Sequence, residues 1–244
     1  MITISQFNLK EIINQTIFST APNDNNKMMT GELFEVSDNT LKVVGLDGHR
    51  IAIRNIQLEG RADDVKAVVP GKTLQEISKL MSTDAENMVN IYFTNNHILF
   101  EFDNTIVVSR LIEGEYFKIN QMLSSDYETK VVINKKEFIG SIDRANLLIT
   151  ESEKKPIIIN ITDGSLEVTV NSSKGKFNED INIKKEGKDL MIGFNPKFLM
   201  DALRVIDDEN VDIYLVNPKA PCFIRDASQS YISVSYTHLT LPTN

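Results

Sequence analysis

The sequence has few of the residue types that build disulfides and metal sites. Its 244 residues include one cysteine, three histidines and no tryptophan. The single Cys222 cannot form a disulfide within the chain, which is typical of a reducing compartment, and its place in a predicted strand favours a buried, inert thiol. His49, His97 and His238 are scattered, and no Cys/His spacing resembles a zinc site. The sequence therefore predicts no metal and no cofactor.

Long apolar runs and catalytic signatures are also missing. No run approaches the roughly 20 apolar residues that span a bilayer, and the N-terminus has no apolar signal region. There is no P-loop, no G-x-S-x-G elbow and no Rossmann glycine fingerprint. Asp47 and His49 form the one acid–histidine pair, which is compatible with a tight turn, a recognition loop or, without a local nucleophile or metal, catalysis. We predict no catalytic residue and a protein that is not an enzyme.

The sequence also lacks a surplus of positive charge. The formal net charge is −8, with 41% hydrophobic and 25% charged residues, a composition typical of a folded protein. A protein that holds nucleic acid over its whole surface is usually basic. Any role with nucleic acid must therefore depend on a local positive face of an acidic body.

The sequence does contain one unit that occurs four times. In each copy a short β-branched run meets a small or polar residue and turns into an amphipathic helix, starting at residues 2, 67, 131 and 191. The helices align on Leu9, Leu74, Phe138 and Leu199, which are 65, 64 and 61 residues apart. Such a regular period indicates duplicated modules.

Alternating runs and polar turns predict strands between these helices, so that each half of the chain has the order β-α-β-β-β twice. This order predicts an α+β fold in which two helices pack on antiparallel sheets in each domain. Leu9, Ile12, Ile13 and Ile17 give the first helix its apolar stripe, and a charged strand is expected from about 177 to 184. The alternation stops at 113–118, which predicts domains at 1–117 and 118–234. Residues 235–244 do not continue the pattern and are interpreted as a non-native tail.

Each predicted helix places basic residues on the side opposite its apolar stripe. Lys72 and Lys79 are seven residues apart, as are Lys197 and Arg204, and Lys136 and Arg144 are eight apart. Lys10 has the matching position on the first helix. Such residues are compatible with an ordinary solvated face. Their repetition in an acidic chain is also compatible with a basic stripe that contacts a phosphate backbone without reading bases.

Several motifs resemble those of the bacterial DNA polymerase III β subunits, the β sliding clamps. They are Val44-Gly45-Leu46-Asp47-Gly48-His49-Arg50-Ile51-Ala52, Val68-Val69-Pro70, Arg110-Leu111-Ile112-Glu113-Gly114-Glu115-Tyr116, Gly193-Phe194-Asn195 and Asp226-Ala227-Ser228-Gln229-Ser230-Tyr231. With the fourfold period, the resemblance covers residues 1 to about 234. It implies the DNA-clamp fold and the middle and C-terminal clamp domains, with the N-terminal domain missing.

The resemblance also implies a function. In this family three similar domains per subunit and two subunits close a ring, with helices lining the hole. The ring encloses duplex DNA, slides along it and tethers the replicative polymerase, and the clamp loader is a further partner. A bacterial cytoplasmic protein without catalysis, acting as a processivity factor, is therefore expected. A β-rich protein-interaction module without a DNA role is the alternative.

The resemblance further implies the residues of two contact surfaces. The family's pocket for short linear peptide motifs would correspond to Met29, Leu46, Gly48, His49, Arg50, Ile51, Phe117, Gln121 and Met122. Phe117 stands where the family usually has proline, Gln121 where arginine is common, and Leu46 where threonine is typical. Leu147 and Leu148 end the third helix, where they are compatible with ordinary core, and the resemblance favours a contact with a second subunit.

Overall fold

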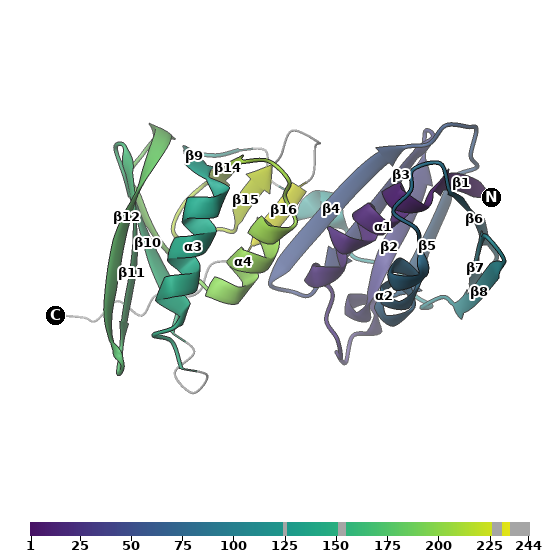
Figure 1. The fold of residues 1–244 in the computed structure, drawn as a ribbon, viewed down its shortest axis with the longest axis horizontal. Helices are drawn as coiled ribbons and strands as arrows, with labels where there is room; N and C mark the ends of the chain where they lie inside the picture. The colour runs from purple at the N-terminus through teal and green to yellow at the C-terminus, as the bar shows by residue number, and fades with distance from the viewer. Residues whose placement is uncertain (124–125, 151–154, 226–230, 235–244) are drawn as a thin grey trace. The chain divides into compact units, whose positions relative to one another are not determined.

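The computed structural model describes residues 1–123, 126–150, 155–225 and 231–234 of the chain (Figure 1). The chain divides into two compact units, Met1–Met122 and Leu123–Asn244. The predicted tail at 235–244 lies outside the described residues. Among the helices of the described part, none is long and apolar enough to cross a membrane.

The first unit consists of two four-stranded antiparallel sheets and two α-helices. Its strands are β1 (Ile2–Ser5), β2 (Gly31–Ser37), β3 (Thr40–Leu46), β4 (Arg50–Gln57), β5 (Val65–Pro70), β6 (Met88–Phe93), β7 (His97–Phe102) and β8 (Thr105–Arg110). Its helices are α1 (Gln6–Asn14), α2 (Gly71–Leu80) and the short 3-10 turns η1 (Ile17–Ser19), η2 (Lys27–Thr30) and η3 (Ile119–Gln121). One sheet has the order β1-β6-β7-β8, and the other has the order β4-β3-β2-β5.

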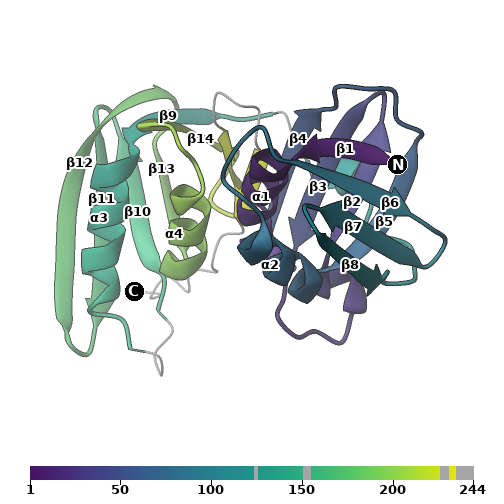
Figure 2. The same cartoon turned by 45° about the vertical axis from the view of Figure 1, so that its right-hand side comes forward.

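The second unit repeats this order of elements. Its strands are β9 (Thr129–Asn134), β10 (Ile157–Thr162), β11 (Ser165–Ser172), β12 (Gly175–Gly187), β13 (Leu190–Phe194), β14 (Asn210–Leu215), β15 (Cys222–Arg225) and β16 (Tyr231–Val234), and its helices are α3 (Lys135–Asn146) and α4 (Pro196–Arg204). The strand order is β13-β10-β11-β12-β9-β14-β15-β16. Figure 2 shows α3 and α4 side by side in front of the strands.

Side-chain caps explain where α1, α3 and α4 begin. The Ser5 hydroxyl accepts a hydrogen bond from the Asn8 amide at 3.1 Å, and Asn134 and Asn195 cap α3 and α4 in the same way. Inside the helices, the four anchors Leu9, Leu74, Phe138 and Leu199 are at most 1% exposed. The fourfold period of the sequence is therefore the period of the buried helix faces, which confirms the predicted α+β fold.

The predicted ends were wrong in three elements, one of which is α3, because it ends at Asn146 and not at Leu148. Ile17 does not continue the stripe of α1, because the helix ends at Asn14 and Ile17 begins η1. The charged strand is longer than the predicted 177–184, because β12 extends from Gly175 to Gly187.

Candidate functional site

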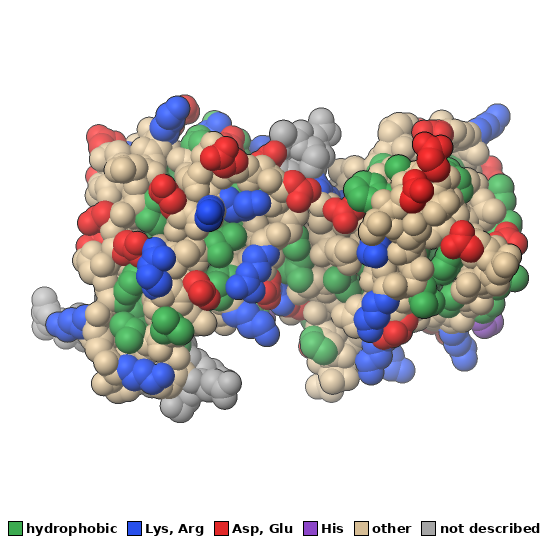
Figure 3. Space-filling view, in the orientation of Figure 1, with side chains coloured by type: hydrophobic (Ala, Val, Ile, Leu, Met, Phe, Trp, Pro, Cys, Tyr) green, Lys and Arg blue, Asp and Glu red, His purple; other side chains and the backbone are tan. Residues whose placement is uncertain are grey.

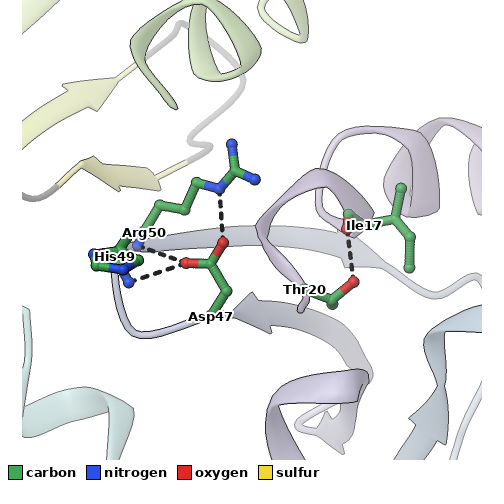
Figure 4. Close-up of polar contacts among 5 residues, drawn as sticks. All are labelled: Ile17, Thr20, Asp47, His49 and Arg50. Atoms are coloured by element: carbon green, nitrogen blue, oxygen red, sulfur yellow. Dashed lines mark hydrogen bonds and ion pairs between the residues drawn. The ribbon is translucent and has the colours of Figure 1, made fainter. Parts of the chain in front are cut away.

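The turn between β3 and β4 is organised by one carboxylate. Oδ1 of Asp47 accepts hydrogen bonds from the backbone amides of His49 and Arg50 at 3.0 and 3.1 Å, and Oδ2 pairs with Arg50 Nε at 2.9 Å (Figure 4). Gly48 has φ +83°, a conformation that glycine adopts without strain. The Arg50 guanidinium also lies 5.4 Å from the centre of the Phe18 ring. The Asp47 carboxylate therefore holds the turn and Arg50 in place. These bonds are those expected if Asp47 and His49 belong to a tight turn.

The face of the β4-β3-β2-β5 sheet opposite α1 and α2 is called the outer face here. On the other face Phe34, Val36, Leu41 and Val43 pack into the core with the two helices. Because side chains alternate along a strand, Lys42, Val44 and Leu46 share the outer face of β3. Leu46 lies opposite Ile51 of β4 in the register, so these two predicted pocket residues are cross-strand neighbours.

The segment after β8 covers part of this outer face. The hydroxyl of buried Tyr116 donates to Val44 O at 3.2 Å, and its ring meets Phe117 edge-on with 5.4 Å between ring centres. Burial, together with the neighbouring Glu32, raises the pKa of Tyr116 above its usual range. Ile119 is also buried. The residues 115–121, which we call the connector, are thus anchored on the sheet.

A cavity of about 320 Å³ lies between the connector and the sheet. Its lining contains Phe117 and Gln121 from the predicted pocket, together with Leu33, Lys42 and Lys66. These three strand residues were not predicted as site residues. The alternation of β3 could have indicated Lys42, since it lies on the same face as Leu46.

The remaining predicted pocket residues lie around the Asp47 turn or at the end of the connector. The Met29 methyl carbon is 3.8 Å from the place that a Cβ on Gly48 would take. Arg50 is buried and His49 is exposed. Met122, the last residue of the first unit, is exposed.

A buried acid lies under the same sheet. Glu32 of β2 is fully buried, and neither of its carboxylate oxygens has a hydrogen-bond partner among the described residues. The nearby Thr16 hydroxyl donates to Ile12 O at 2.7 Å. Burial, opposed by a contribution from Thr16, raises the pKa of Glu32 to about 8. Glu32 is therefore mostly protonated at neutral pH, which its position in an apolar run did not reveal.

The predicted DNA-facing cations fall into two groups. Three of them have partners within their own unit. Lys10 Nζ donates to Met81 O at 3.1 Å at the end of α2, Lys79 pairs with Glu76 at 2.7 Å, and Arg144 pairs with Glu179 through bonds of 3.1 and 2.6 Å. The other four, Lys72, Lys136, Lys197 and Arg204, are exposed.

The charge of the helices differs from that of the whole chain. Together α1 to α4 carry eight Lys and Arg and five Asp and Glu, whereas the chain has a net charge of −8. Figure 3 shows basic and acidic side chains interspersed over α3 and α4. Within each unit the two helices lie side by side. The four helices therefore carry a modest surplus of positive charge, although the chain as a whole is acidic.

The predicted subunit-contact residues follow the third helix rather than end it, because α3 stops at Asn146 and Leu147 is its C-cap. Leu147 is 72% exposed and Leu148 is half-buried. An exposed leucine of this size at a helix end does not belong to the core of its own unit. Among the described residues, no group of three or more His, Cys, Asp and Glu could hold a metal ion.

The fold is that of DNA clamps. A crystal structure of a putative DNA polymerase III β subunit from Eubacterium rectale superposes with a TM-score of 0.96 at 63% identity, over 98% of this chain and 66% of that one. A Pseudomonas aeruginosa sliding clamp bound to griselimycin matches with a TM-score of 0.91 at 26% identity, over 97% of this chain and 65% of that one.

The sequence comparisons identify the family. Models of the central and C-terminal domains of the DNA polymerase III β subunit match residues 3–118 and 120–243. The β sliding clamp of Staphylococcus epidermidis is 34% identical over 236 residues. This chain belongs to the DNA polymerase III β subunit family, as its motifs indicated. It spans 61% of the length of the S. epidermidis relative.

Proposed function

We propose that this chain is the central and C-terminal part of a DNA sliding clamp, a non-catalytic processivity factor. The observation that supports this most directly is the match of two consecutive clamp domains along the chain. In the proposal, the subunit closes a ring with a second subunit around duplex DNA. The ring then tethers the replicative polymerase and is opened by a clamp loader.

The helices are the proposed DNA-facing surface. Lys72, Lys136, Lys197 and Arg204 are exposed on helices with a surplus of basic residues, and their contacts would be to phosphates without sequence preference. Lys10, Lys79 and Arg144 have partners and are expected to contribute less. We also propose that Leu147 and Leu148 contact the second subunit.

DNA association tests this surface. Changing Lys72, Lys136, Lys197 and Arg204 to Gln should weaken binding to a fluorescent 30-base-pair duplex at low salt by at least tenfold, measured by anisotropy. A control with Lys27, Lys66, Lys118 and Lys174 changed to Gln has the same net charge and should bind like the unchanged chain. Equal binding by both variants would favour the alternative of an interaction module without a DNA role.

Ring closure needs a separate test in a longer protein that also contains the preceding domain. Such a protein should remain on a circular plasmid through gel filtration and leave it when one nuclease cut linearises the plasmid. Retention that does not depend on circularity would contradict the topological part of the proposal.

The peptide pocket is proposed to lie around Leu46, Ile51 and the Asp47 turn, bordered by Phe117 and Gln121. The apolar cross-strand pair beside a fixed arginine is the combination that small ligand sites use, with apolar walls and few polar groups. The P. aeruginosa clamp was solved with griselimycin, so this compound is a suitable probe.

Calorimetric titration with griselimycin tests the pocket. Arg50→Ala should weaken binding by about tenfold, because it removes a buried guanidinium held by Asp47. Arg61→Ala, at an exposed position, is the matched control and should leave the affinity unchanged. An unchanged affinity in Arg50→Ala would move the pocket away from the Asp47 turn.

A further inference from the structure

The cavity under the connector contains a row of charges that the peptide pocket does not explain. Glu35 of β2 lies opposite Lys42 of β3 on one side and opposite Lys66 of β5 on the other. Its carboxylate is 3.0 Å from Lys42 Nζ and 3.7 Å from Lys66 Nζ. One carboxylate thus faces two ammonium groups, which leaves positive charge at the cavity.

The other charged residues that line the cavity keep its net charge positive. Lys118 of the connector adds a third cation and Glu115 a second carboxylate, in a chain whose net charge is −8. Leu33, Tyr116 and Phe117 provide apolar walls. The volume of about 320 Å³ lies at the small end for ligand pockets and suits a single side chain or a few atoms more. The cavity therefore fits a group with an apolar stem and an anionic end.

The position of the cavity relates it to the proposed peptide pocket. Lys42 and Leu46 lie on the same face of β3 and are four residues apart, which corresponds to about 13 Å along a strand. An extended peptide covers the same length with four residues. Phe117 and Gln121 line the cavity and also belong to the predicted pocket.

We propose that this cavity is an acidic-residue subsite of the peptide pocket. It binds a Glu or Asp side chain of a partner peptide about four residues from the apolar residue seated at Leu46 and Ile51, with Lys42 and Lys66 as its cationic contacts. The proposal rests on the peptide-binding function proposed above and adds a specificity to it. Lys42 and Lys66 are then specificity-determining residues rather than solvated lysines.

A matched pair of peptides tests the subsite. The probes are acetyl-Glu-Ser-Ser-Ser-Leu-Phe and the same peptide with Gln in place of Glu, titrated by calorimetry at low salt. The Glu peptide should bind about fivefold more tightly, as expected for partly exposed ion pairs, and the difference should shrink at high salt. In Lys42→Gln/Lys66→Gln the two peptides should bind equally, with the affinity of the Gln peptide unchanged.

The controls separate the possible outcomes. Lys27→Gln/Lys174→Gln has the same charge and should keep the preference for Glu. Lys66→Gln alone, at an exposed position, should reduce the preference even if the double variant does not fold. Equal binding of both peptides to the unchanged chain, or a preference that survives in the double variant, overturns the subsite. If griselimycin binds, the peptide pocket stands whatever the peptides show; if neither griselimycin nor either peptide binds, the pocket and the subsite both fail.

Discussion

The two units share one order of elements but join their sheets differently. In the second unit β12 has 13 residues, and it pairs with β11 along Gly175–Asn182 and with β9 along Ile183–Gly187. In the first unit the corresponding strand β4 has 8 residues and pairs with β3, while β1 pairs with β6, and within this fully described unit no pairing joins β4 to β1. Strand β12 thus joins the two sheets of the second unit, whereas no strand joins the two sheets of the first unit. We call the unpaired edge between β4 and β1 the open seam.

A cavity of about 340 Å³ lies at this open seam, lined by Ile2, Thr3, Leu58 and Arg61 among others. The first unit is nevertheless compact, with α1, α2 and both sheets packed on one apolar core. The first unit therefore keeps one common core without backbone pairing between its two sheets, whereas the second unit has that pairing in addition.

A second difference concerns one core position. Glu32 of β2 is paired with Val69, two residues before α2, and Ile157 of β10 is paired with Phe194, two residues before α4. The two positions are therefore equivalent, and both side chains are fully buried. The first unit has an acid where the second has isoleucine.

Replacing each of these two residues by the other should change the free energy of unfolding, and this is the largest effect that we expect. Burial raises the folded-state pKa of Glu32 from 4.5 to about 8, so the contribution of Glu32 to stability is most favourable below pH 4.5 and declines as the pH rises towards 8. Glu32→Ile should remove this dependence and stabilise the first unit by about 3 kcal/mol at pH 7. Urea unfolding at pH 5, 6, 7 and 8 measures the change.

The reverse substitution supplies the control. Ile157→Glu should destabilise the second unit by several kcal/mol and give it the pH dependence that Glu32→Ile removes. If Glu32→Ile leaves the slope of stability against pH unchanged, the pKa of Glu32 is not raised in the folded protein, and its side chain is ionised at neutral pH.

The open seam should produce the next largest effect. β9 has strand partners on both sides, whereas β1 has β6 on one side. Backbone amides of β1 that point away from β6 are therefore expected to exchange with solvent at least tenfold faster than amides of β9 that point to β12. Native-state hydrogen exchange followed by NMR measures both. Equal protection in the two strands would show that the seam of the first unit is closed in solution.

The fold was largely readable from the sequence, because the pattern of buried helix residues repeats along the chain. Leu9, Leu74, Phe138 and Leu199 were found by spacing and are all buried. The errors occurred where tertiary contacts override local pattern. α1 ends early where the Thr16 carbonyl packs so closely on Gly45 that a Cβ there would lie 2.5 Å from it. The length of β12 was underestimated because its many exposed polar residues give no apolar signal.

Less of the candidate site could be predicted from the sequence. Resemblance indicated the Asp47 turn, and the Asp47–Arg50 bonds explain its geometry. The sequence did not reveal Lys66, because the cross-strand register that places it beside Glu35 depends on strands far apart along the chain. Lys10 was assigned to a free helix face, yet its long side chain reaches a carbonyl at the end of α2.

The smallest expected effect concerns how the second helix of each unit begins. In the second unit the Asn195 side chain accepts a hydrogen bond from the Lys197 amide at 3.0 Å, whereas α2 of the first unit follows Pro70 without a side-chain cap. Asn195→Ala should therefore cost about 1 kcal/mol of unfolding free energy, measured by urea unfolding. Asn217→Ala, in a turn outside the helices where the side chain accepts from the Lys219 amide, is the matched control and should cost less. If the two variants are equally destabilised, the loss reflects a generic turn hydrogen bond rather than the start of α4.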